Sequence, residues 1–171
     1  MTMSMQQDPE REKQYEELVQ VSKQVEARFP GDPNVDKLLG FARKLGVNFL
    51  PSEVHEQWLY HPAERIMTVW LPDLSAGNTD FVIVMLAHEL GHVVDFDRHP
   101  EYLQHLRGLH WSEVPRQIES SAFVTGFKIL LTLGIPADPR VYAAYVDGLP
   151  TEDLLRSLEK ARDEVESAAS A

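Results

Sequence analysis

The sequence predicts an α+β fold, mostly helical, in which a small sheet of three or four strands packs beside one long helix. Apolar residues at helical spacing dominate both ends of the chain. Short runs of β-branched and aromatic residues, bounded by turn residues, gather between residues 47 and 71. A longer apolar run follows them and suits a buried helix better than a strand.

Two helices are expected at the N-terminal end of the chain. Asp8 and Pro9 form a start signal, because aspartate can cap free backbone N–H groups and proline fits the first helical position. Asp32 and Pro33 repeat this signal for a second helix, which Gly46 is expected to end. These helices should cover the sheet.

Three segments are predicted as strands, residues 47–50, 58–60 and 66–71. The third has the clearest strand composition, and Pro72 ends it. This strand can lie at a sheet edge, where an extended peptide can pair with it, or inside the sheet with no free edge. The sequence leaves both arrangements open.

A long buried helix is predicted from the wholly apolar residues 81–87 and from Val93 beyond them. Thr79 or Asn78 can cap its N-terminus, and Asp80 suits the positive end of the helix dipole. Polar groups inside such a helix are costly unless something satisfies them. Any polar motif within it therefore indicates a specific partner.

The motif in this helix is His88-Glu89-Leu90-Gly91-His92. Positions four apart share a helix face, so both imidazoles can bind one metal ion. Glu89 is rotated about 100° from His88 and suits a general base that does not bind the metal. Gly91 costs helix stability; either a close backbone neighbour requires it or it is harmless. The pattern predicts a catalytic zinc site.

Catalytic zinc usually has three protein ligands and one open position. The possible third ligands downstream of the motif are Asp95, Asp97, His99, His105, His110, Glu113 and Glu119. A three-histidine arrangement is disfavoured, because Asp95 stands where that pattern needs glycine and Arg98 where it needs histidine. A carboxylate on a second helix is the other common solution.

The second helix is expected from Ser112, its cap, to Leu133, with Pro115 in its first turn. Glu119 lies within the apolar pattern of this helix and is assigned as the third ligand. Glu113 falls in the first turn, where a carboxylate already stabilises the helix dipole. The predicted metal ligands are therefore His88, His92 and Glu119, and the cofactor is Zn²⁺.

These residues resemble the ImmA/IrrE family of small zinc peptidases over about residues 35–136. The resemblance is carried by Ala87–His92, the 27-residue gap from His92 to Glu119, and Ala122, Ile129, Leu130 and Pro136. It implies a zincin-like fold, zinc on His88, His92 and Glu119, and Glu89 as catalytic base. It also implies a stress-related protease that cleaves or inactivates a helix-turn-helix repressor.

The chain departs from that family pattern at two places. Phe123 stands where asparagine is frequent, and Thr125-Gly126 stands where the family often has Phe-Ala. The sequence from His88 to Asp95 also resembles other gluzincins, including lethal-factor-like peptidases. The expected activity is that of a gluzincin-type zinc metalloendopeptidase; the alternative is a non-catalytic zinc module that binds a partner.

Asp95 shares the helix face of the two motif histidines. It can accept the second ring N–H of a ligand histidine and so orient that ring. It can equally be an exposed acid near the end of the helix, where the dipole disfavours it. Both readings stay open.

His110 is assigned as the catalytic group that stabilises the developing oxyanion, with Tyr102 and His105 as alternatives. His55 and His61 precede the third predicted strand and are expected to form a polar groove wall. A peptidase of this type activates water through zinc and Glu89.

Two further helices are expected after residue 136, beginning at Asp138-Pro139 and at Thr151. The last carries an apolar stripe formed by Leu154, Leu158, Ala161 and Val165. Such a stripe usually packs on its own core, although it can bind a partner helix.

Composition limits the remaining possibilities. The chain has 171 residues, 43% of them hydrophobic, and suits one domain over residues 1–171, with frayed tails at 1–7 and 167–171. It has no cysteine, so zinc must be held by nitrogen and oxygen. A net charge of −11 disfavours direct nucleic-acid binding. Without a signal peptide or membrane span, the protein is expected to be cytoplasmic.

Overall fold

The computed structural model describes residues 8–106, 114–147 and 151–171. Within these ranges the chain forms seven helices, three strands and two short 3-10 turns. They are α1 (Pro9–Glu26), α2 (Pro33–Lys44), β1 (Asn48–Pro51), β2 (Leu59–His61), β3 (Ile66–Val69), η1 (Leu71–Leu74), η2 (Ala76–Asn78), α3 (Thr79–Arg98), α4 (Tyr102–Leu106), α5 (Arg116–Thr132), α6 (Pro139–Asp147) and α7 (Glu152–Ala169). The predicted mostly helical α+β fold is confirmed.

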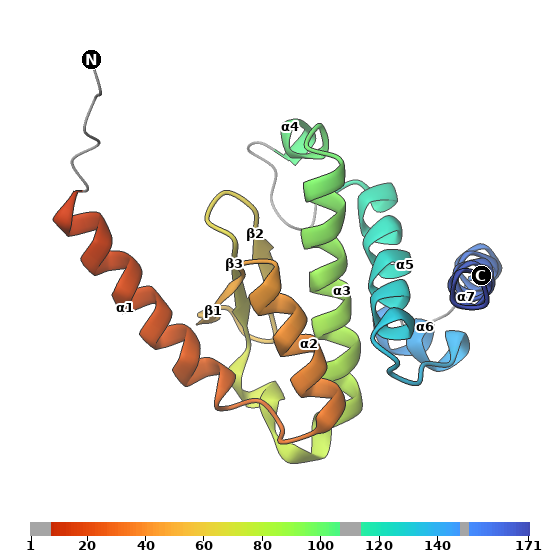
Figure 1. Cartoon of the computed structure of the whole chain (residues 1–171), viewed down its shortest axis with the longest axis horizontal. Helices are drawn as coiled ribbons and strands as arrows, with labels where there is room; N and C mark the ends of the chain where they lie inside the picture. Colours follow the sequence, from red (N-terminus) through yellow and green to blue (C-terminus); the bar gives the residue numbers. More distant parts are fainter. Residues whose placement is uncertain (1–7, 107–113, 148–150) are drawn as a thin grey trace.

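The long helix α3 runs through the middle of the molecule (Figure 1). The sheet and α1 lie on one side of it, and α5 followed by α7 lie on the other. Within the described chain α3 packs most extensively against α5, and also contacts α2, α6 and β2. Its burial follows from the apolar run that forms most of its surface.

The sheet has the strand order β1-β3-β2. β3 pairs in parallel with β1 and antiparallel with β2, so the strand predicted at residues 66–71 is internal and has no free edge. Its possible placement at the sheet edge is therefore wrong. The edge beside α3 is formed by β2, which leads into β3 through a short antiparallel connection.

Four helices begin as the sequence predicts. The side chains of Asp8, Asp32 and Thr151 accept backbone N–H groups at the starts of α1, α2 and α7. Asp138 does the same for α6, through Arg140 and Val141. Gly46 has a φ of 71°, the left-handed conformation expected after α2.

Two helix starts differ from the predictions. Asn78 precedes α3 without a side-chain cap, because the turn η2 leads directly into the helix. Pro115 is not in the first turn of α5 but precedes it with extended backbone, and its carbonyl accepts the N–H groups of Ile118 and Glu119. Proline disfavours helical backbone in the residue before it, which explains the later start. Ser112 lies outside the described residues.

The apolar stripe of α7 packs against α5 and α6. Leu154, Leu158 and Ala161 are buried there, as a stripe that packs on its own core requires. The helix reaches Ala169 and so takes in part of the tail expected at residues 167–171. None of the helices in the described part of the chain has the length and apolarity needed to cross a membrane.

The backbones of α3 and α5 approach closely at two glycines. A methyl group at Gly91 would strike the carbonyl oxygen of Ala122 and lie 2.9 Å from the backbone nitrogen of Gly126. A methyl group at Gly126 would lie 2.5 Å from the carbonyl oxygen of Ala87. Gly91 is therefore required by a close neighbour, and that neighbour is the helix that carries Glu119.

Candidate metal site

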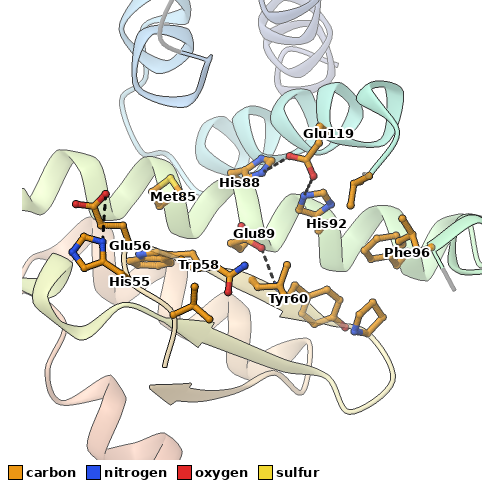
Figure 2. Close-up of a pocket in the computed structure, with 16 residues that line it drawn as sticks. His55, Glu56, Trp58, Tyr60, Met85, His88, Glu89, His92, Phe96 and Glu119 are labelled. Carbon is orange, nitrogen blue, oxygen red and sulfur yellow. Dashed lines mark hydrogen bonds and ion pairs between the residues drawn. The ribbon is translucent and has the colours of Figure 1, made fainter. Parts of the chain in front are cut away.

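Two histidines from α3 and a glutamate from the first turn of α5 come together. The Nε2 atom of His88 lies 3.2 Å from one carboxylate oxygen of Glu119, and the Nε2 atom of His92 lies 3.1 Å from the other. Figure 2 shows the Glu119 carboxylate facing both rings. The three groups offer ligand atoms that all lie within 4.8 Å of one another, so they form a possible metal-binding triad.

The donor set fits zinc. Two imidazole nitrogens and one carboxylate oxygen are ligands that zinc prefers, and three of them leave one position of a tetrahedron open. Both histidines are buried, and their Nδ1 atoms have no hydrogen-bond partner among the described residues. Because both Nε2 atoms face the Glu119 carboxylate, His88, His92 and Glu119 would hold the ion.

Without a metal, burial and mutual contacts decide the protonation of the triad. Burial lowers the pKa of His88 to about 4. Burial also opposes the charged form of His92, but its hydrogen bond to Glu119 and the nearby carboxylates raise its pKa overall. Burial disfavours the Glu119 carboxylate, yet the two histidines hold the pKa of that carboxyl well below its usual range. The raised pKa of His92 means that a metal competes with a proton for this ring, so metal binding should weaken as the pH falls.

Glu89 points from α3 towards the sheet (Figure 2). One of its carboxylate oxygens accepts the backbone N–H of Tyr60, at 3.1 Å. Burial raises the pKa of Glu89 to about 7. A carboxylate with such a pKa can take up and release a proton near neutral pH.

Aromatic rings pack against both histidines of the triad. The Phe123 ring packs on His88 with 4.1 Å between centroids, and Phe96 stacks on His92 with 5.7 Å between centroids. Phe123 is the residue that replaces the family's frequent asparagine. From the sequence, Phe123 was predicted only as a departure from the family pattern; its packing on the His88 ring could not be foreseen, because the two residues lie on different helices.

The triad and Glu89 line a cleft of about 460 Å³. Its remaining wall is mostly apolar and comes from the segment before β2, from α3 and from the chain on either side of residues 107–113. The apolar residues of this wall include Val54, Trp58, Leu59, Met85, Leu106 and Val114. The edge strand β2 therefore forms one side of the cleft.

The other possible ligands lie apart from the triad or beyond the described residues. Asp95 is buried and hydrogen-bonded to Thr125, so the reading of Asp95 as an exposed acid is wrong. Asp97 forms an ion pair with Arg65 on the surface. The exposed His99 pairs with Glu101. Glu113 lies outside the described residues.

The oxyanion stabiliser stays a prediction. His110, the residue assigned to that role, lies outside the described residues. Tyr102, which stacks on His99, and the exposed His105 are both absent from the described lining of the cleft. His55 does line it, whereas His61 bonds to Thr68.

Comparison with known protein families, curated proteins and solved structures gives no match for this chain. The resemblance to the ImmA/IrrE family thus depends on the motif residues. The possible metal site depends on the geometry of His88, His92 and Glu119.

Proposed function

We propose that this protein is a zinc-dependent endopeptidase that hydrolyses a protein substrate. The observation that carries the proposal is the cleft in which a possible metal-binding triad and the buried Glu89 carboxylate meet. Zinc in such a site supplies Lewis-acid activation of water and of a peptide carbonyl. Glu89 takes the proton from the water and returns it to the leaving amine.

The residues around the cleft also suit an extended peptide. β2 is an edge strand, and its Tyr60 N–H points away from β3 towards Glu89. A substrate strand beside β2 would pass the triad, with its apolar side chains against the cleft wall. Following the resemblance described above, we propose a cytoplasmic helix-turn-helix repressor as the substrate and a stress response as the setting.

The first test is metal content. Purified protein supplied with zinc should retain about one equivalent after gel filtration, and His88→Ala, His92→Ala and Glu119→Ala should each lose most of it. His99→Ala is the control, because His99 is exposed and its ring contacts Glu101 and Tyr102 rather than the triad. Unchanged zinc content in Glu119→Ala would exclude Glu119 as a ligand.

The second test separates catalysis from metal binding. Glu89→Gln should bind zinc normally but cleave a mixture of quenched fluorescent peptides at least 100-fold more slowly. Glu64→Gln, an exposed glutamate outside the cleft, is the matched control. If wild-type protein binds zinc but cleaves neither the peptides nor candidate repressors, the alternative of a non-catalytic zinc-binding module gains support.

A further inference from the structure

Asp95 is a buried carboxylate that the proposed chemistry does not use. Its side chain lies in α3, one turn after His92, with only 4% of the residue exposed. One carboxylate oxygen accepts a hydrogen bond from the Thr125 hydroxyl of α5, at 2.7 Å. The other oxygen has no partner among the described residues. A buried carboxylate is costly unless both oxygens are satisfied, so the second oxygen needs a donor.

A suitable donor lies on the preceding turn. Because His92 directs Nε2 towards Glu119, its Nδ1 atom is left without a described partner. Residues three apart are neighbours on a helix surface, and helical side chains lean towards the N-terminus. Asp95 therefore covers the turn that carries His92. An unsatisfied acceptor and an unsatisfied ring nitrogen therefore lie on successive turns of one helix face, although no hydrogen bond or ion pair joins them in the metal-free structure.

We propose that Asp95 and Thr125 form a positioning pair for the metal site. Asp95 accepts the Nδ1–H of His92 when Nε2 binds the metal, and the Thr125 hydroxyl fixes the carboxylate. This inference rests on the proposed zinc site. It means that α5 acts on that site twice, directly through Glu119 and indirectly through Thr125.

Such a pair should change metal affinity and the state of one ring nitrogen. Asp95→Asn leaves the shape but weakens the acceptor, and should lower the affinity about 10- to 100-fold. Thr125→Val removes only the hydroxyl and should lower the metal affinity several-fold. Thr125→Ser keeps the hydroxyl and should bind the metal as tightly as the wild-type protein. The metal-loaded wild-type protein should also show a protected His92 Nδ1–H proton resonance that Asp95→Asn loses.

The experiment titrates the full chain with Co²⁺, followed by visible absorption, and with Zn²⁺ in competition with a chelator. Asp97→Asn is the matched control for the acid, because Asp97 is exposed on the same helix and pairs with Arg65. Thr132→Val is the control for the hydroxyl, because Thr132 is exposed on the same helix as Thr125.

Two results would overturn the inference in distinguishable ways. If wild-type protein binds neither ion, the metal site itself is wrong and the pair has nothing to position. If Asp95→Asn and Thr125→Val bind the metal ions as tightly as wild-type protein does, with unchanged spectra, the Asp95–Thr125 hydrogen bond serves only to hold α3 and α5 together. Should Asp95→Asn fail to fold, the comparison of Thr125→Val with Thr125→Ser decides alone.

Discussion

Glu89 connects the sheet to the candidate metal site. It is carried by α3, yet its carboxylate is held by the Tyr60 backbone of β2. Burial outweighs that hydrogen bond and the charge of His92, so the pKa of Glu89 rises to about 7. The folded metal-free protein therefore binds a proton on Glu89 more tightly than the unfolded chain does.

This difference makes stability depend on pH. A raised pKa in the folded state contributes stability that is present below about pH 4.5 and is lost as the pH rises through about 7. From pH 4.5 to 8 the free energy of unfolding of wild-type protein should fall by about 3 kcal/mol relative to that of Glu89→Gln. Urea unfolding in the presence of chelator measures this free energy at each pH, with Glu64→Gln as the control variant. If the difference in unfolding free energy between the two proteins does not change with pH, Glu89 does not bind a proton more tightly in the folded state.

The contact between Glu89 and Tyr60 could not be predicted from the sequence. Helical periodicity brings His88 and His92 to one face, and the apolar pattern of the next helix points to Glu119. No comparable pattern links Tyr60 to a residue 29 positions later, because that contact depends on how the sheet packs on α3. Thr125 was missed for the same reason, since its hydroxyl partner lies on another helix.

At the scale of elements, the packing of α5 on α3 decides whether a site forms. Glu119 reaches the histidines because the two helices touch backbone to backbone at Gly91 and Gly126. A single added methyl group cannot be accommodated by side-chain movement there, since it would meet main-chain atoms. The distance of Glu119 from the two histidines therefore depends on glycine at positions 91 and 126.

Opposite effects are expected from the same substitution at two helical glycines. Gly126→Ala should lower the free energy of unfolding by about 2–3 kcal/mol, because it forces α5 away from the Ala87 carbonyl. Gly40→Ala, in α2, should raise it by up to about 1 kcal/mol, because the nearest atom is the end of the Arg43 side chain at 3.9 Å. Chemical denaturation of both variants checks the signs. Equal effects would mean that the helices can separate freely.

Element types were predictable, but their arrangement in the sheet was not. Aspartate–proline pairs located the starts of α1, α2 and α6 closely, and Thr151 located that of α7. The three strands have only three or four residues each, which is too short for a pattern that fixes their order. The clearest strand proved to be the central one, and the shortest, β2, lies beside the site.

At the scale of the whole molecule, the triad joins two parts of the chain. His88 and His92 belong to the helix that contacts β2 and α2, whereas Glu119 belongs to the helix that packs with α7. A metal held by all three would link these parts only when the chain is folded. Its binding free energy would then stabilise the whole fold.

Zinc is therefore expected to raise the melting temperature. At a free zinc concentration 100-fold above Kd, the stabilisation is about 2.7 kcal/mol, which corresponds to about 5–10 °C for a chain of this size. Calorimetry with and without zinc measures the shift, and chelator should reverse it. Glu119→Ala should show little of it; an equal shift in that variant would point to zinc bound elsewhere.

The two outer strands of the sheet have consequences for self-association. The Phe49 N–H of β1 is taken up by the Ser22 hydroxyl of α1, and the Tyr60 N–H of β2 by Glu89. Exposed strand edges recruit other chains into intermolecular sheets, and here both edges have a backbone amide occupied. In the substrate-free protein, Glu89 thus also keeps the Tyr60 amide of the β2 edge from pairing with other chains. Light scattering of concentrated metal-free Glu89→Ala should show aggregates that wild-type protein lacks, and a clear solution would argue against this role.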